Sequence, residues 1–261
     1  MAEDRTPVIS LRGIRNQFGP HVVHDNLDLD VWPGEVVGVV GGSGTGKSVL
    51  LRTIAGLRRP QAGSIRLFGI DALAASEAER QALDRRMGVM FQDGALFSAL
   101  TVRENVEVPL RDIPGLPARL RRDLADLKIA MSGLPYLAGD KYPSELSGGM
   151  RKRAGIARAL ALDPELVFLD EPTAGLDPIG ASEFDVLIRG LSRQLGLAVF
   201  LVTHDLDTLH ATCDRIAVLA EKRVLYTGTM QDMLKIDHPW VHEYFHGPRA
   251  RAAQETLDRK Q

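Results

Sequence analysis

The sequence contains a single cysteine, few aromatic residues and no marked excess of charge of either sign. Cys213 alone cannot form a disulfide within the chain, which excludes a disulfide-bonded scaffold and fits a reducing compartment. A formal net charge of -2 provides no basic field that would draw the protein to nucleic acid or anionic lipid. The length of 261 residues predicts one large domain, or one domain with a subdomain.

Long hydrophobic runs are also missing. The longest, such as Leu197 to Val202, are far shorter than the ~20 residues that span a bilayer. The segment from Met1 to Pro7 is polar and charged, so we expect no secretory signal. These features predict a cytoplasmic chain whose role at a membrane would come through a partner.

A glycine-rich loop is the strongest motif that the sequence does contain. It is Gly41-Gly42-Ser43-Gly44-Thr45-Gly46-Lys47-Ser48, which fits the G-x-x-x-x-G-K-S pattern of phosphate-binding loops. A buried strand is predicted before it and a helix after it, so backbone N–H groups and the helix dipole can hold phosphate. Lys47 can reach the β- and γ-phosphates and Ser48 can bind Mg²⁺. A loop that only turns the chain would need none of these features.

Three further apolar runs end on polar residues, and they are predicted to be buried strands: residues 87–91, 166–169 and 197–203. Ligands of doubly wound sheets lie beyond such strand ends. We therefore expect Gln92 to reach a metal or an attacking water, Asp170 to hold Mg²⁺, and Glu171 to orient or deprotonate that water. His204 is placed to contact a γ-phosphate. A lone glutamine or histidine after a strand is otherwise a loop or structural residue.

The composition changes between Ala95 and Pro143, where five prolines separate short helical segments. This predicts a small helical subdomain inserted between strands, with an irregular surface excursion as the alternative. Several of its side chains are more apolar than a solvated loop requires, which indicates a surface for a partner: Phe97, Leu100, Val102, Val106, Val108 and Leu110. Ser147-Gly148-Gly149 then opens a predicted helix, and these residues fit either a second anion-binding turn or an ordinary helix cap.

The two ends of the chain carry weaker signals. Alternating runs at residues 8–14 and 27–31 predict an antiparallel β layer. Phe18 lies between them, where it could stack on a nucleobase or belong to the core. Near the other end, Trp240, Tyr244 and Phe245 begin a polar tail. We expect these rings to dock on a dimer partner or a regulatory subunit, with fraying beyond Pro248.

The order of these motifs resembles that of the nucleotide-binding subunits of ATP-binding cassette (ABC) transporters, over about residues 8–235. The matching segments are Phe18 (aromatic loop), Gly41 to Ser48 (Walker A), Gln92 (Q-loop), Leu146 to Met150 (signature), Leu166 to Asp170 with Glu171 (Walker B and catalytic carboxylate), Gly175-Leu176-Asp177 (D-loop) and His204 (switch histidine). Met150 replaces the usual glutamine and Ala174-Gly175 the usual Ser-Ala. Neither change removes a phosphate or metal ligand.

The resemblance implies the fold and the site together. The fold is an α/β P-loop NTPase of ABC type, with a mixed parallel-sheet RecA-like core, an antiparallel β layer and an inserted α-helical subdomain. The implied division is 1–94 and 163–236 for the core, 95–162 for the helical signature subdomain and 237–261 for the tail. A homodimer would bind ATP and Mg²⁺ in two composite sites. Phosphates would contact Gly41, Gly42, Ser43, Gly44, Thr45, Gly46, Lys47 and Ser48 of one chain, with Phe18 on adenine, and Ser147, Gly148, Gly149 and Asp177 would complete the site. Mg²⁺ would be held by Ser48, Gln92 and Asp170, with Glu171, His204 and Gln92 in catalytic roles.

Local segments are similar to the ATPases of Mla-type phospholipid transport systems of Gram-negative envelopes: Ser147 to Met150, Phe91 to Ser98 and Val108 to Arg111. This implies an ATPase that drives phospholipid transport and maintains outer-membrane lipid asymmetry, bound peripherally to the cytoplasmic side of the inner membrane. Implied partners are integral-membrane permease subunits, an MCE-type lipid-binding protein and a small cytoplasmic regulatory subunit, but no nucleic acid. A cassette for another solute is the alternative. A non-transport cassette is disfavoured, because those usually carry two cassettes or long insertions.

Overall fold

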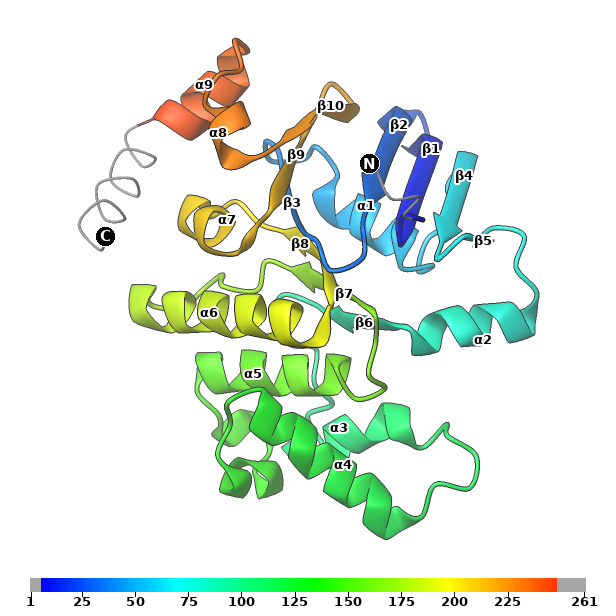
Figure 1. Ribbon diagram of the computed structural model, residues 1–261, viewed down its shortest axis with the longest axis vertical. Helices are drawn as coiled ribbons and strands as arrows, with labels where there is room; N and C mark the ends of the chain where they lie inside the picture. Colours follow the sequence, from blue (N-terminus) through cyan, green and yellow to red (C-terminus); the bar gives the residue numbers. More distant parts are fainter. Residues whose placement is uncertain (1–5, 248–261) are drawn as a thin grey trace.

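Two β-sheets lie next to each other in the computed structural model, which describes residues 6–247 (Figure 1). The larger sheet has the strand order β10-β9-β3-β8-β7-β6 and the smaller has the order β2-β1-β4-β5. The larger sheet comprises β3 (Val36–Val40), β6 (Met87–Met90), β7 (Leu166–Asp170), β8 (Ala198–Val202), β9 (Arg215–Ala220) and β10 (Arg223–Gly228). The smaller comprises β1 (Ile9–Phe18), β2 (His21–Val31), β4 (Ala62–Leu67) and β5 (Ile70–Asp71).

Unbroken apolar sequence explains the centre of the larger sheet. β3, β7 and β8 are buried along their whole length and pair in parallel. Central parallel strands have this pattern because both of their faces are covered. β10 pairs antiparallel with β9, so the sheet is mixed, as predicted. Parallel strands end at one edge, and the polar residues that follow β7 and β8 are therefore brought together there.

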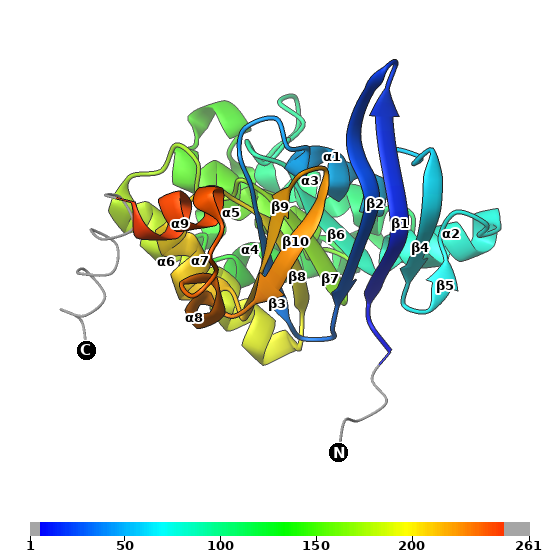
Figure 2. The ribbon, with the colours of Figure 1, turned by 90° about the horizontal axis from the view of Figure 1, so that it is seen from above.

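The smaller sheet is antiparallel, as predicted, and its first strand is longer than its alternating pattern indicated. Register shifts after Leu11, Ile14 and Asn16 let β1 bend and continue as far as Phe18. Its inward side chains join one apolar core with α1 and the larger sheet: Ile9, Leu11, Ile14, Leu50, Leu51, Ile54 and Val37. Seen from above, the β1–β2 hairpin stands beside the larger sheet and projects past α1 (Figure 2).

Helices fill the connections between strands. They are α1 (Lys47–Ile54), α2 (Glu77–Arg85), α3 (Val102–Leu110), α4 (Ala118–Met131), α5 (Gly148–Ala159), α6 (Pro178–Leu195), α7 (Leu206–Thr212), α8 (Met230–Met233) and α9 (Pro239–His246), with short 3-10 turns η1 (Tyr136–Asp140) and η2 (Pro143–Glu145). Capping boxes at Ser76 and Thr101 start α2 and α3. Left-handed Gly196 ends α6.

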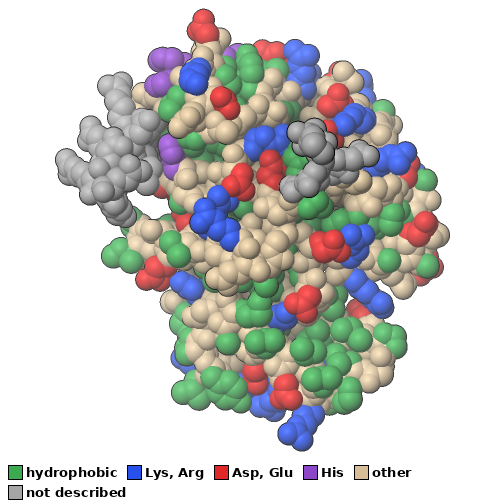
Figure 3. Space-filling model, in the orientation of Figure 1, with side chains coloured by type: hydrophobic (Ala, Val, Ile, Leu, Met, Phe, Trp, Pro, Cys, Tyr) green, Lys and Arg blue, Asp and Glu red, His purple; other side chains and the backbone are tan. Residues whose placement is uncertain are grey.

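The segment between β6 and β7 is helical and has an apolar cluster of its own. Val102, Val106 and Leu110 are buried there against α4 and α5. They are core residues, so the prediction that they face a partner is wrong, because the same apolar spacing serves a helix interior. Phe97 is exposed, as are several apolar side chains on α4 and the turns that follow it: Leu120, Leu127, Tyr136 and Leu137. Figure 3 shows hydrophobic side chains gathered over this part of the molecule.

The aromatic start of the tail forms α9, which packs on its own chain. Val241 and Phe245 are buried with Val40 of β3 and Ile216 of β9. The expectation that these rings serve a partner is therefore wrong for Phe245, whose ring fills the chain's own core. The predicted fraying beyond Pro248 lies outside the described residues. The division at residues 94/95, 162/163 and 236/237 stays a prediction.

Candidate active site

The glycine-rich loop lies between β3 and α1, in a conformation that depends on its glycines. Gly44 and Gly46 have φ angles of 79° and 94°. A Cβ at Gly46 would lie 2.3 Å from Val23 Cγ1 and 2.6 Å from His24 Nε2, both on β2. Only glycine fits a left-handed position under such a close approach. The β layer thus packs directly beneath the loop.

The Lys47 ammonium folds back over the loop that precedes it. Its Nζ donates to the carbonyl oxygens of Gly41 at 2.8 Å and Gly42 at 3.1 Å. Burial lowers the pKa of Lys47, and the nearby carboxylates of Glu171 and Asp170 oppose that shift. A cation is therefore held beside the loop with two acids close by.

Ser48 connects the first turn of α1 to the end of β7. Its Oγ donates to Oδ1 of Asp170 at 3.0 Å, and the Asp170 side chain is buried. These are hard oxygen donors of the kind that Mg²⁺ prefers. Sequence reasoning placed both residues in one metal site, and the fold brings their side chains into contact.

Glu171 and His204 meet at the edge where β7 and β8 end. His204 Nδ1 lies 2.8 Å from Glu171 Oε2, and the imidazole is 68% exposed, whereas the carboxylate is 17% exposed. Glu171 has a φ of 50°, an uncommon backbone conformation for this residue type, and its N–H donates to Val202 O at 2.8 Å. The bond to β8 fixes this turn, so the carboxylate is directed to the imidazole.

Lys152 on α5 joins this edge, and sequence reasoning missed it. Its Nζ donates to Gln92 O at 2.7 Å and to Glu171 O at 3.2 Å. The side chain is buried, and burial lowers its pKa. A signal was present in the sequence, since Lys152, Ile156 and Ala159 share one helix face and a lysine on an apolar face needs a partner. The Gln92 side chain itself is exposed.

The Ser147-Gly148-Gly149 turn lies at the start of α5. Ser147 Oγ accepts a hydrogen bond from Met150 N at 3.2 Å, which is an ordinary N-cap. A Cβ at Gly148 or Gly149 would lie 3.9 Å from Leu176 Cδ2. Within residues 6–247, no hydrogen bond joins this turn to the glycine-rich loop. Within one chain these two predicted anion-binding elements remain separate.

Asp177 is the N-cap of α6, and the residue before it, Leu176, lies against that turn. Its Oδ1 accepts from Gly180 N at 3.0 Å and Ile179 N at 3.1 Å. Hydrogen bonds from these backbone groups lower the pKa of Asp177. The carboxylate is therefore a helix cap, whereas the family resemblance implied only a role at the nucleotide for Asp177.

His24 forms a buried polar network beneath the loop. Asn16 Nδ2 lies 3.0 Å from His24 Nδ1, and Thr53 Oγ1 donates to Asn16 Oδ1 at 3.3 Å. His24 Nε2 is buried without a hydrogen-bond partner among the described residues. Burial lowers the pKa of His24 to about 4. A neutral imidazole thus supports the loop from below.

Two aromatic rings come from opposite ends of the chain: Phe18 on the hairpin whose strand β2 lies beneath the loop, and Trp240 on α9. Phe18 ends β1 and is 46% exposed, so it is not a core residue. Trp240 of α9 stacks on Tyr244 with ring centroids 4.9 Å apart. Its Nε1 would lie 3.5 Å from a Cβ at Gly42.

Among residues 6–247, no helix is both long and apolar enough to cross a membrane.

Comparison with known proteins gives consistent matches. Residues 24–174 match the family model for the ABC transporter. The chain is 37% identical over 243 residues to the "Probable ribonucleotide transport ATP-binding protein mkl" of Mycobacterium leprae, covering 92% of this chain and 69% of that protein. It is 44% identical over 216 residues to the "Methionine import ATP-binding protein MetN" of Caulobacter vibrioides, covering 82% and 64%.

A third relative is matched over most of its length. The "Intermembrane phospholipid transport system ATP-binding protein MlaF" of Haemophilus influenzae is 36% identical over 240 residues, which is 92% of this chain and 90% of that protein. Among solved structures, a dimeric post-hydrolysis state of the ATP-binding cassette MJ0796 bound to ADP and Pi superposes with a TM-score of 0.77. It is 30% identical and covers 85% of this chain and 98% of that one.

Proposed function

This chain belongs to the ABC transporter family as an ATP-hydrolysing subunit, and we propose that the transport it drives is that of phospholipid. The observation that supports this most is the match to the phospholipid system ATPase over 90% of that protein's length. The methionine import protein has higher identity, 44%, but this chain covers only 64% of it. Import of another solute is thus the second candidate.

We propose the following roles within one chain. The loop from Gly41 to Ser48 holds the phosphates through backbone N–H groups and the Lys47 ammonium. Ser48 and Asp170 hold Mg²⁺, with Gln92 nearby, and the 3.0 Å contact of their oxygen atoms supports this assignment. When bound, Mg²⁺ neutralises charge that develops on the phosphate oxygens.

Glu171 is proposed as the general base and His204 as the group that positions it. The 2.8 Å contact between His204 Nδ1 and Glu171 Oε2 supports the proposal that the two side chains act together in hydrolysis. The Glu171 carboxylate takes a proton from water as that water attacks the γ-phosphate. The exposed His204 imidazole can then turn to the phosphate and hold it in line. Phe18 is proposed to stack on adenine.

The composite site is proposed to need a second copy of the chain. No hydrogen bond within residues 6–247 joins the Ser147-Gly148-Gly149 turn to the loop of its own chain. The turn is therefore free to contact the partner's γ-phosphate. Their helix N-terminus supplies backbone N–H groups and partial positive charge. The similar MJ0796 cassette, described as dimeric and bound to ADP and Pi, supports this arrangement. Two sites per dimer follow from symmetry.

The proposed partners are those of a phospholipid system. They are integral-membrane permease subunits, an MCE-type protein and a small cytoplasmic regulatory subunit, with the chain on the cytoplasmic side of the inner membrane. The net charge of -2 argues against nucleic acid. Purification of the tagged full chain from membranes, with mass spectrometry of co-eluting proteins and lipids, tests this. A permease with an MCE protein and bound phospholipid is expected, and an amino-acid permease with a periplasmic binding protein would contradict the lipid assignment.

A further inference from the structure

The tip of the β1–β2 hairpin is fastened to the loop that joins α1 to β4. The backbone N–H of Gln17 donates to Gln61 Oε1 at 2.6 Å. In return, Arg58 Nη2 donates to the carbonyl oxygen of Gln17 at 2.7 Å. These two bonds act on the residue that directly precedes Phe18. The hairpin tip is therefore anchored at the base of the exposed ring.

Arg58 also covers one face of that ring. Its guanidinium carbon lies 3.6 Å from the centroid of Phe18. A cation at this distance is attracted by the electron-rich face of an aromatic ring. Arg58 Nε is buried and has no hydrogen-bond partner among the described residues. The side chain thus gives up one hydrogen bond to lie against the ring.

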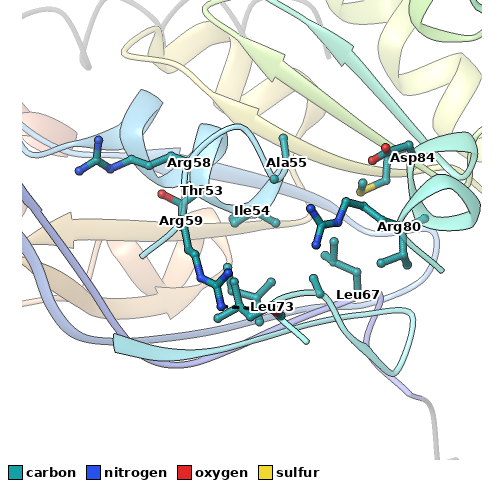
Figure 4. Close-up of a pocket in the computed structure, with 14 residues that line it drawn as sticks. Thr53, Ile54, Ala55, Arg58, Arg59, Leu67, Leu73, Arg80 and Asp84 are labelled. Carbon is teal, nitrogen blue, oxygen red and sulfur yellow. Dashed lines mark hydrogen bonds between the residues drawn. The ribbon is translucent and has the colours of Figure 1, made fainter. Parts of the chain in front are cut away.

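Figure 4 shows that this orientation is particular to Arg58 among three neighbouring arginines. All three line a cavity of about 100 Å³ between α1, β4 and α2. Arg59 turns toward Leu73, to whose carbonyl its Nη2 donates at 3.5 Å, and Arg80 reaches across the cavity. The Arg58 guanidinium points away from the cavity. Only the aliphatic part of Arg58 lines the cavity, whereas its guanidinium contacts Gln17 and Phe18 of the hairpin.

Phe18 lies on the same hairpin as the residue beneath the glycine-rich loop. Asn16 pairs with His24, and His24 lies directly beneath Gly46. Phe18 follows Asn16 by two residues, which is ~7 Å at about 3.3 Å per residue. The residue is 46% exposed although Arg58 covers one face of the ring, so its open surface lies away from Arg58.

We propose that Arg58 is a positioning residue for the nucleobase. It holds the Phe18 ring from one side, so that the base of a nucleotide stacks on the other. A ring that is ordered in advance loses less conformational freedom when a ligand binds. This inference rests on the proposed nucleotide site, because it assigns to Arg58 a part in base binding and none in phosphate binding.

The test compares a ligand that has a base with one that has none. ADP binding to the full chain is measured by calorimetry, and tripolyphosphate binding by displacement of a fluorescent nucleotide. Arg58→Ala should raise the Kd of ADP about threefold to tenfold and leave that of tripolyphosphate within about twofold. Arg58→Lys keeps the charge but cannot stack a planar group, so it should behave as Arg58→Ala does. Arg59→Ala, the matched control, should bind both ligands as the wild type does.

Two further results decide the mechanism. In a Phe18→Leu background, Arg58→Ala should cause no additional loss of ADP affinity. Unchanged ADP affinity in Arg58→Ala would overturn the inference, and so would an equal loss for tripolyphosphate, since that would indicate attraction between Arg58 and the phosphates. If the wild type binds neither ligand, the proposed nucleotide site itself is wrong. Thermal unfolding of each variant confirms that it is folded.

Discussion

Single residues at the site fall into those that sequence motifs predict and those that only the fold can reveal. Lys47, Asp170, Glu171 and His204 follow predicted strands, and the fold brings their side chains together. Their catalytic roles stay predictions. His24 could not be recognised, because its significance comes from Gly46, which is distant in sequence and lies over it.

The buried His24 makes a testable contribution to pH dependence. Its pKa is about 4 in the folded chain because of burial, whereas an unfolded histidine titrates near ~6.5. The folded state therefore binds fewer protons than the unfolded state. The folding stability that neutral His24 contributes is present at neutral pH and is lost as the pH falls from ~6.5 toward 4. The stability of the wild type relative to His24→Leu should therefore fall by ~2 kcal/mol between pH 7 and pH 5.

Urea unfolding of both chains at the two pH values measures this difference. Asp185, whose pKa burial raises to about 7, titrates in the opposite sense but is present in both chains and cancels. Parallel stability curves for the two chains would show that His24 does not titrate as burial requires.

Lys152 gives a second prediction at this scale. Lys152→Met keeps the length of the stem but removes the donor to the carbonyls of Gln92 and Glu171. We expect ATP turnover to fall ~10- to 150-fold, since a lost hydrogen bond to a charged group is worth ~1.5–3 kcal/mol. Steady-state phosphate release measures it. Arg153→Met removes another cation of the same helix, one that binds Glu183 and Ser132 instead, and should retain turnover within about twofold. Wild-type turnover in Lys152→Met would show that these two hydrogen bonds do not position Gln92 and Glu171 for hydrolysis.

The sequence predicts whole elements well where a run is apolar throughout. It predicts them poorly where the packing of neighbouring elements decides which face is buried. β3, β7 and β8 are unbroken apolar runs, so their strand character and parallel pairing could be read directly. The apolar residues of α3 were assigned to a partner surface, because spacing alone does not tell which elements cover a helix face. α9 was misjudged for the same reason, since its burial depends on Val40 and Ile216.

The packing of α9 on β3 leads to an element-scale prediction. Phe245 is buried beside Val40, the residue that precedes the glycine-rich loop. Phe245→Ala should lower stability by ~3–5 kcal/mol, which corresponds to a fall in Tm of about 10 °C. Differential scanning calorimetry measures the shift. Tyr136→Ala, at an exposed ring, should change the Tm by less than about 2 °C. A Tm unaffected by Phe245→Ala would mean that α9 does not dock on the core.

At the scale of the whole molecule, the two proposed halves of the site are joined by no hydrogen bond within residues 6–247 of one chain. The glycine-rich loop stands between the β layer and the larger sheet, while the start of α5 lies beside Leu176. Gly148 makes a useful probe, since a Cβ there meets only Leu176 Cδ2 at 3.9 Å, an ordinary contact. Gly148→Asp should fold normally, because an acid is favourable at a helix N-terminus, but would repel a partner's γ-phosphate.

Glu171→Gln should bind ATP and lack hydrolysis, so that the closed assembly accumulates. The central claim is that two chains enclose each nucleotide, and the mass of this variant in Mg-ATP, measured by sedimentation velocity, tests it most directly. We predict twice the 28.5 kDa of one chain with ATP, one chain's mass without it, and one chain's mass when Gly148→Asp is added. A particle of 28.5 kDa with ATP bound at saturation would contradict the claim.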